Sequence, residues 1–155
     1  MTPTTATADE PRVLVLGAGS IGSRHARNLA AAGAGVAVAD PDADRAGAVE
    51  GAEAVAYDLD GLDRFDGVVV ASPTSEHLAQ ATSVAEASVP ALVEKPLAMT
   101  AEEAAALASA RDRITVGFNL RFHDPVRRLV DIVHGGRIGR PRSGRPVHAG
   151  LGAAR

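Results

Sequence analysis

The chain has 155 residues, of which 46% are apolar and 23% are charged, and it contains no cysteine and no tryptophan. This composition supports one domain with a buried core, and it argues against a large two-domain enzyme, global disorder, a disulfide scaffold, a thiolate metal site and a cysteine nucleophile. The formal net charge is −3, with the basic residues concentrated after residue 110. These arginines are scattered and show no helix-turn-helix or zinc spacing, so no nucleic-acid partner is expected.

Short apolar runs alternate with longer amphipathic runs along the chain, as strands alternate with helices. The apolar runs predict strands over residues 12–17, 36–39, 52–57, 67–71, 91–94 and 114–118. The amphipathic runs predict helices over residues 20–32, 42–49, 76–87, 100–110 and 125–134. Thr100 and Glu103 have the spacing of a capping box at the start of one of these helices. Strands that are apolar on both faces favour a doubly wound, parallel α/β sheet of the Rossmann type, with strand order 3-2-1-4-5-6.

Both ends of the chain depart from this pattern. Residues 1–10 lack the basic and apolar segments of a secretory signal, and we expect a disordered leader there. Residues 140–155 are rich in Gly, Arg and Pro, and we expect an irregular or disordered tail. A single Rossmann domain is therefore expected over residues 11–139. No apolar run approaches the about 18 residues that cross a bilayer, so no membrane contact and a cytoplasmic location are expected.

Residues 17–22 (GAGSIG) form a G-x-G-x-x-G motif between a predicted strand and a predicted helix, which is the context that dinucleotide binding requires. Gly17 permits a tight turn, Gly19 lets a pyrophosphate approach the backbone, and Gly22 lets the helix pack closely on the strand. The free N–H groups at the start of the helix would then face the phosphates. The alternative is a glycine-rich turn that binds nothing.

Asp40 follows the second predicted strand, 23 residues after Gly17. An acidic residue at this spacing typically binds the ribose hydroxyls of NAD. Its charge repels a 2′-phosphate and so favours NAD over NADP, although the nearby Arg45 weakens this inference. The alternative is that Asp40 only caps the helix that follows Pro41.

Three further segments follow the fourth, fifth and sixth predicted strands, namely residues 72–77 (SPTSEH), 94–96 (EKP) and 116–122 (VGFNLRF). In an open α/β sheet, ligands bind outside the carboxyl ends of the strands. We therefore expect all three segments to meet at the sheet edge that holds the cofactor.

Together, GAGSIGSRHARNL, Asp40, the P-T-x-x-H run, EKPLA and GFNLRF resemble the Gfo/Idh/MocA family of nicotinamide-dependent oxidoreductases, over about residues 12–139. The resemblance implies contacts with the pyrophosphate, the adenosine ribose, the nicotinamide ribose and the substrate hydroxyl. The pyrophosphate would be lined by Gly17, Gly19, Ser20, Ile21 and Gly22, and the adenosine ribose by Asp40. The nicotinamide ribose side would be bordered by Ser72, Pro73, Thr74 and His77. Glu94 and Lys95 would reach the nicotinamide ribose and the substrate hydroxyl. It also implies that Asn119 and Arg121 edge the substrate cleft and that the bond before Pro96 is a candidate for cis.

Lys95 is the only lysine in the sequence, and it is the candidate catalytic residue. Hydride loss from a carbinol carbon requires that the hydroxyl proton be removed or polarised, which a lysine can do and an arginine cannot easily do. The alternative is that Lys95 merely pairs with Glu94. His77 either contacts ribose or substrate or binds local backbone, and His25 is interpreted as a packing or surface residue. No histidine pair has metal-ligand spacing, so no metal is expected.

Members of the family carry a second domain that supplies most of the substrate pocket, and this chain stops where that domain would begin. The resemblance thus implies a truncation or a reading-frame change near Arg142. We expect a chain that binds NAD, with hydride transfer to or from a sugar, cyclitol or related polyol as the ancestral reaction and little or no turnover alone. Self-association through the face left exposed is also expected. The alternatives are a non-catalytic dinucleotide-binding module, a half-enzyme completed by a partner chain, and a non-functional fragment.

Overall fold

A computed structural model describes residues 10–110 and 112–144. It divides the chain into two compact units, Met1–Phe118 and Asn119–Arg155. Most of the expected leader and tail lies outside the described residues, and residues 140–144 form no helix or strand. The domain boundaries at residues 11 and 139 stay a prediction.

The first unit is built on one parallel sheet with the strand order β3-β2-β1-β4-β5-β6, as the sequence predicts. The strands are β1 (Arg12–Leu16), β2 (Gly35–Ala39), β3 (Glu53–Ala54), β4 (Gly67–Val70), β5 (Ala91–Glu94) and β6 (Ile114–Gly117). At the carboxyl end of β1, Leu16 aligns with Ala39 of β2 on one side and with Val70 of β4 on the other. The strand order therefore reverses at β1, and in open α/β sheets the ligand crevice lies at such a reversal, here beside the loops that follow β1 and β4.

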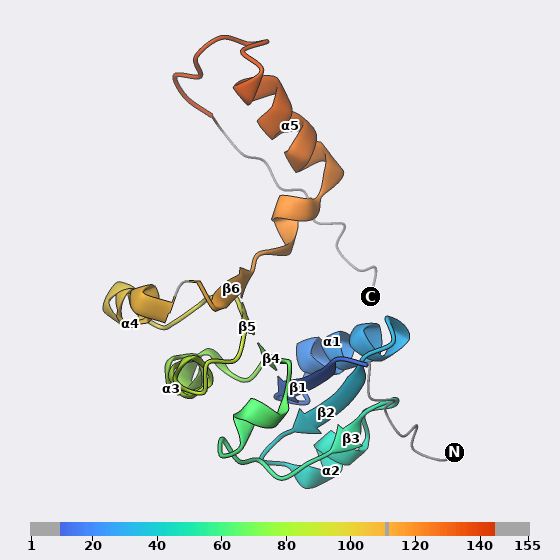
Figure 1. Ribbon diagram of the computed structural model, residues 1–155. Helices are drawn as coiled ribbons and strands as arrows, with labels where there is room; N and C mark the ends of the chain where they lie inside the picture. Colours follow the sequence, from blue (N-terminus) through green and yellow to red (C-terminus); the bar gives the residue numbers. More distant parts are fainter. Residues whose placement is uncertain (1–9, 111, 145–155) are drawn as a thin grey trace, which may run out of the picture. The chain divides into compact units, whose positions relative to one another are not determined.

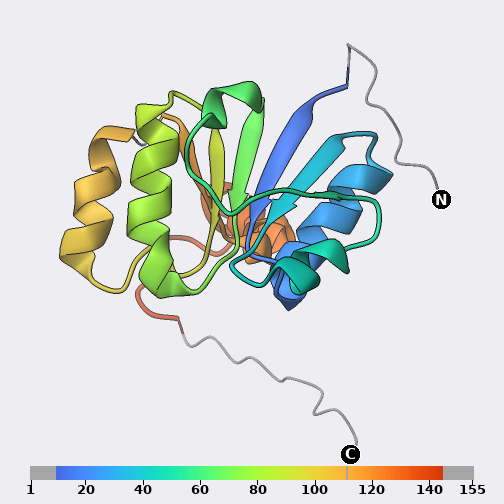
Figure 2. The ribbon, with the colours of Figure 1, turned by 90° about the horizontal axis from the view of Figure 1, so that it is seen from below.

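Helices cover both faces of this sheet. They are α1 (Ser20–Ala31), α2 (Ala43–Gly47), α3 (Thr74–Glu86) and α4 (Ala101–Ala106), the last continued by a 3₁₀ helix over Leu107–Ala110. Ala26 of α1 and Ala46 of α2 pack on Val15 and Val38 at one face. At the other face, Val84 of α3 and residues of the 3₁₀ helix join a second buried cluster. Figure 1 shows α1 on one side of the strands and α3 on the other, and Figure 2 shows α3 and α4 side by side.

Three elements are shorter than the sequence predicts by three residues or more, and the helix expected over residues 42–49 is reduced to Ala43–Gly47. The expected strand over residues 52–57 reduces to Glu53–Ala54, which lies at the sheet edge with both residues exposed. The expected helix over residues 100–110 tightens into a 3₁₀ turn after Ala106. The predicted capping box is confirmed, because the Thr100 side chain accepts from the Glu103 N–H and the Glu103 side chain accepts from the Thr100 N–H.

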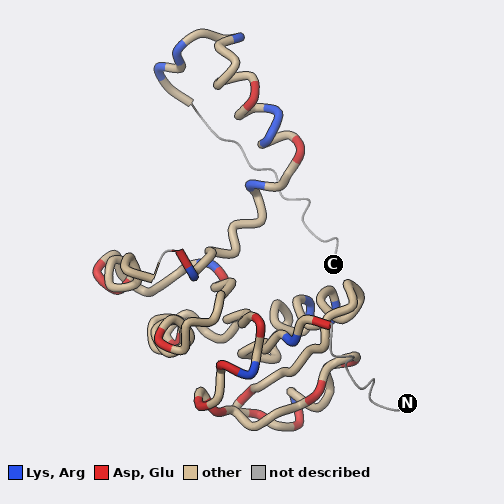
Figure 3. The backbone as a smooth tube through the Cα atoms, viewed as in Figure 1, with Lys and Arg blue, Asp and Glu red and all other residues tan. Residues whose placement is uncertain are grey.

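The second unit contains a 3₁₀ helix over Asn119–Phe122 and α5 over Asp124–His134, with Pro125 in its first turn. Phe122 and Leu129 are exposed within it. Its described residues carry more basic than acidic side chains, whereas acidic side chains predominate in the first unit (Figure 3). No helix in the described part of the chain is long and apolar enough to span a membrane. The expected self-association stays a prediction.

Candidate functional site

Internal packing requires two glycines here, Gly17 in the loop after β1 and Gly22 in the first turn of α1. Gly17 has φ +97°, and a Cβ there would lie 2.8 Å from the backbone nitrogen of Ser72, in the loop after β4. A Cβ on Gly22 would overlap the carbonyl oxygen of Gly17. Because both clashes are with backbone, larger residues at these positions would displace the loop. The loops after β1 and β4 are therefore in direct backbone contact at the crevice.

Gly19 differs from these two glycines, because a Cβ there would meet nothing within 4 Å. It is the N-cap of α1 in extended conformation, and no side chain caps the helix. The first-turn N–H groups of α1 consequently have no acceptor within the helix. Ser20 and Ile21, which begin that turn, are exposed. Open space beside uncapped amides at a helix start fits a diphosphate group, as the motif predicts.

Asp40 lies at the end of β2, with its side chain 7% exposed. One carboxylate oxygen accepts from the Ala18 N–H at 2.7 Å, and the other accepts from the Asp42 N–H at 2.9 Å and lies 3.5 Å from the Arg45 guanidinium. Burial opposes ionisation, but these backbone hydrogen bonds and the charge of Arg45 outweigh it, so the pKa of Asp40 is lowered. An ionised carboxylate offers about four acceptor positions, so capacity for a ribose hydroxyl remains.

The loop after β4 is held by side chains of α3. The Ser72 hydroxyl donates to Gln80 Oε1 at 2.7 Å, and Gln80 Nε2 donates to the Tyr57 hydroxyl at 2.6 Å. Gln80, at the centre of this chain of hydrogen bonds, is 1% exposed, whereas Tyr57 at its end is exposed. Pro73 forms the N-cap of α3 and Thr74 its first residue. The loop predicted to border the nicotinamide ribose therefore has a fixed course.

His77 is 1% exposed and connects two loops of the site. Its Nδ1 lies 2.9 Å from the carbonyl oxygen of Pro96, and its Nε2 lies 3.0 Å from the carbonyl oxygen of Ser72. Both ring nitrogens thus contact backbone, which is the local-backbone alternative considered above. The role predicted for His77 at the nicotinamide ribose stays a prediction.

The turn after β5 contains Glu94, Lys95 and Pro96, and the Lys95–Pro96 bond is cis, as the family resemblance suggests. Glu94 Oε2 accepts from the Lys95 N–H at 3.2 Å, and Glu94 Oε1 lies 2.9 Å from His25 Nε2 on α1. Lys95 itself is exposed. The only lysine of the chain is therefore exposed on a turn whose backbone contacts the Glu94 side chain, which in turn contacts His25.

Two of the predicted site residues belong to the second unit. Asn119 and Arg121 belong to the 3₁₀ helix of the second unit, and their role at a substrate cleft stays a prediction. His25 and Gln80 contact the loops of the site but were not predicted as parts of it from the sequence. His25 lies three residues after Gly22, a spacing that places both on one face of α1. Gln80 lies three residues after His77 on α3, so helical spacing was the available signal for both.

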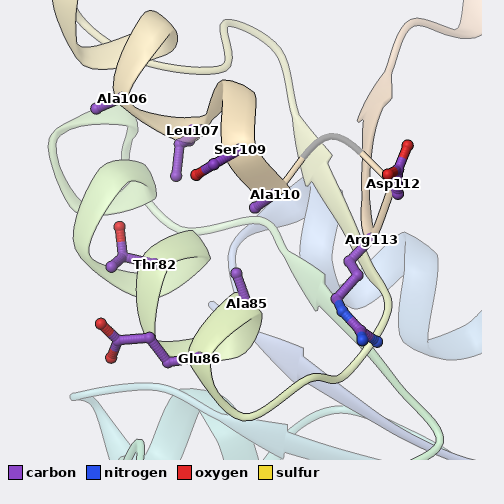
Figure 4. Close-up of a pocket in the computed structure, with 9 residues that line it drawn as sticks. All are labelled: Thr82, Ala85, Glu86, Ala106, Leu107, Ser109, Ala110, Asp112 and Arg113. Carbon is purple, nitrogen blue, oxygen red and sulfur yellow. The ribbon is translucent and has the colours of Figure 1, made fainter.

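A shallow pocket lies elsewhere, between α3 and the 3₁₀ helix that continues α4 (Figure 4). Thr82 and Glu86 line it from α3, and Ser109 lines it from the 3₁₀ helix. Arg113, immediately before β6, also lines it and donates to the Ser88 carbonyl oxygen at 2.9 Å. Because these residues lie at the amino ends of the strands, the pocket is separate from the dinucleotide crevice.

Comparison with known proteins shows the family to which the chain belongs. The model of the Gfo/Idh/MocA oxidoreductase family, described as an NAD-binding Rossmann fold, matches residues 11–118. Inositol 2-dehydrogenase 1 of Saccharopolyspora erythraea is 38% identical over 145 residues, which are 84% of this chain and 43% of that protein. Inositol 2-dehydrogenase of Rubrobacter xylanophilus is 38% identical over 141 residues, with 82% and 40% covered.

Solved structures show the same relationship. The myo-inositol dehydrogenase of Lactobacillus casei, in complex with NAD(H) and myo-inositol, superimposes with a TM-score of 0.77 at 30% identity, covering 85% of this chain and 43% of that one. The UDP-N-acetylglucosamine 3-dehydrogenase of Acidithiobacillus ferrooxidans gives 0.71 at 32% identity, with 79% and 43% covered. The chain thus spans less than half the length of these relatives.

Proposed function

Because the chain belongs to the Gfo/Idh/MocA family of oxidoreductases, in which the matched region is an NAD-binding Rossmann fold, we propose that its first unit binds NAD in the crevice between the loops after β1 and β4. The observation that carries this proposal is the pairing of two features at the end of β1 and β2. Open space lies beside Gly19 at the uncapped start of α1, and the ionised Asp40 carboxylate accepts from the Ala18 N–H of the same loop.

The reaction proposed for this family member is hydride transfer between NAD and the carbinol carbon of a cyclitol, sugar or related polyol. Relatives named as inositol dehydrogenases support the polyol class, and bound NAD supplies the hydride acceptor. Oxidation of a carbinol carbon also releases the hydroxyl proton, and Lys95 is the residue proposed to accept or polarise it. Glu94 is proposed to reach the nicotinamide ribose from the same turn.

We assign NAD rather than NADP as the cofactor on electrostatic grounds. The lowered pKa of Asp40 keeps its carboxylate negative at neutral pH, and a 2′-phosphate placed on the adjacent ribose would be repelled. Arg45 does not offer a free countercharge, because its guanidinium lies 3.5 Å from Asp40 and 3.2 Å from Asp42. The pair of carboxylates therefore competes with a phosphate for this arginine.

Calorimetric titration of the chain with NADH and NADPH, in parallel, tests cofactor binding directly. We expect saturable heat with NADH and a weaker response with NADPH. Absence of binding to both at millimolar concentration would overturn the proposal, and tighter binding of NADPH would overturn the cofactor assignment.

A second assay, with NAD⁺ and myo-inositol, compares the wild type with Lys95→Arg, which keeps the charge but cannot easily release a proton. Measurable turnover that is equal in both would remove Lys95 from the chemistry.

A further inference from the structure

The turn that carries Lys95 is contacted from both sides by histidine side chains. His25 of α1 lies 2.9 Å from the Glu94 carboxylate, immediately before Lys95. His77 of α3 lies 2.9 Å from the carbonyl oxygen of Pro96, immediately after it. These two helices lie on opposite faces of the sheet, so the turn is held from two independent directions.

The contact of His25 with Glu94 is half-buried, with 27% and 18% of the two side chains exposed. The other carboxylate oxygen of Glu94 accepts from the Lys95 N–H at 3.2 Å, so the carboxylate connects the histidine to the lysine backbone. Space for this carboxylate depends on the neighbouring strand β6. A Cβ on Gly117 would lie 3.1 Å from Glu94 Oε1, closer than side chains normally approach. Because residue 117 is glycine, the Glu94 carboxylate has room at the position in which His25 contacts it.

His77 adds a second connection to the loop after β4. Its other ring nitrogen lies 3.0 Å from the Ser72 carbonyl oxygen, and the ring is 1% exposed. A carbonyl oxygen only accepts hydrogen bonds, and a neutral imidazole donates through one nitrogen whereas the doubly protonated ring donates through both. His77 thus lies within hydrogen-bond distance of both loops and can donate to either carbonyl oxygen.

We propose that His25 and His77 are positioning residues for Lys95, which hold its turn through Glu94 and Pro96 without contacting the reacting atoms. The inference rests on the proposed function, because Lys95 matters only where the dinucleotide binds. It adds to that function a physical link between the phosphate-binding helix α1 and the lysine. A change in the position of α1 reaches Lys95 through one side chain pair.

The single lysine makes this link measurable. Reductive methylation with ¹³C-formaldehyde labels the Lys95 amine and the terminal α-amine and keeps their charges, and Lys95→Arg identifies the lysine signal by removing it. The ¹³C spectrum is recorded without and with NADH for the wild type, His25→Ala, His25→Gln and His134→Ala. His134 is exposed at the end of α5 and provides the matched control.

We expect His25→Ala to shift the Lys95 signal without NADH and to reduce its response to NADH. His25→Gln restores both, because its amide N–H can donate to Glu94, and His134→Ala matches the wild type. If circular dichroism shows that His77→Asn is folded, we expect this variant to change the Lys95 signal as His25→Ala does, because it alters the contact on the Pro96 side of the turn. If it does not fold, the His25 series decides the matter alone.

Identical Lys95 signals in folded wild type and His25→Ala, with and without NADH, would overturn the proposal. A shift in His25→Ala that His25→Gln does not restore would also overturn it, because a general packing defect would then explain the change. A wild type that shows no NADH response and no calorimetric binding refutes the proposed function instead. In that case the comparison without NADH still decides whether His25 positions Lys95.

Discussion

Gly19→Ala separates cofactor binding from folding, because the structure leaves room for the added methyl group. A Cβ at this position meets nothing within 4 Å, and the backbone has φ −66°, which any residue adopts. The folded chain should therefore accept the substitution, with a cost in unfolding free energy of under about 1 kcal/mol from the poorer N-cap. A bound diphosphate would instead meet the methyl group.

The expected loss in binding follows from the hydrogen bonds that the methyl group displaces. A hydrogen bond to a charged group contributes about 1.5–3 kcal/mol, so loss of one amide–phosphate contact should weaken NADH binding about 10- to 150-fold. Calorimetry measures the affinity, and urea unfolding followed by circular dichroism measures stability. Gly47→Ala is the matched control, because a Cβ at the end of α2 also meets nothing within 4 Å and lies outside the loop. Wild-type NADH affinity in Gly19→Ala would refute the placement of the diphosphate.

Three further substitutions test the packing and the charge of the site. Gly22→Ala places a Cβ on the Gly17 carbonyl oxygen and should cost about 1–3 kcal/mol of stability in urea unfolding; unchanged stability would show that the loop relaxes freely. Asp40→Asn should lower the unfolding free energy at neutral pH, because the pKa of Asp40 is lowered in the folded state. The difference in unfolding free energy between wild type and variant should disappear as the pH falls through about 4 and below. A pH-independent difference would contradict this assignment. Gln80→Leu removes the partner of the Tyr57 hydroxyl and should cost about 1–3 kcal/mol, with non-additive loss when combined with Tyr57→Phe; additive losses would refute the coupling.

The sequence predicted the sheet well because its inner strands are buried on both faces. Such strands read as uninterrupted apolar runs, as in Arg12–Leu16 and Gly67–Val70. Glu53–Ala54 pairs with β2 at the sheet edge and is exposed, so it carries almost no apolar signal. Its extent is set by tertiary pairing, which local sequence does not encode.

The glycine loop was predictable for a related reason. Turn geometry and helix start are local, so Gly17, Gly19 and Gly22 can be interpreted from their own spacing. The contact of His25 with Glu94 joins residues 69 positions apart, and the Tyr57–Gln80 bond joins different elements. Such contacts exist only once the sheet has formed. His25 was consequently interpreted as a packing or surface residue, although its side chain binds the turn that carries Lys95.

The backbone contact between Gly17 and the Ala71–Ser72 segment constrains how this domain can be recombined with those of its relatives. A chimera that takes residues 17–22 from one protein and residues 71–74 from another would combine two turns whose backbones must touch but which come from different proteins. Exchanges of the glycine loop should therefore transfer both segments together, even though about fifty residues of chain lie between them.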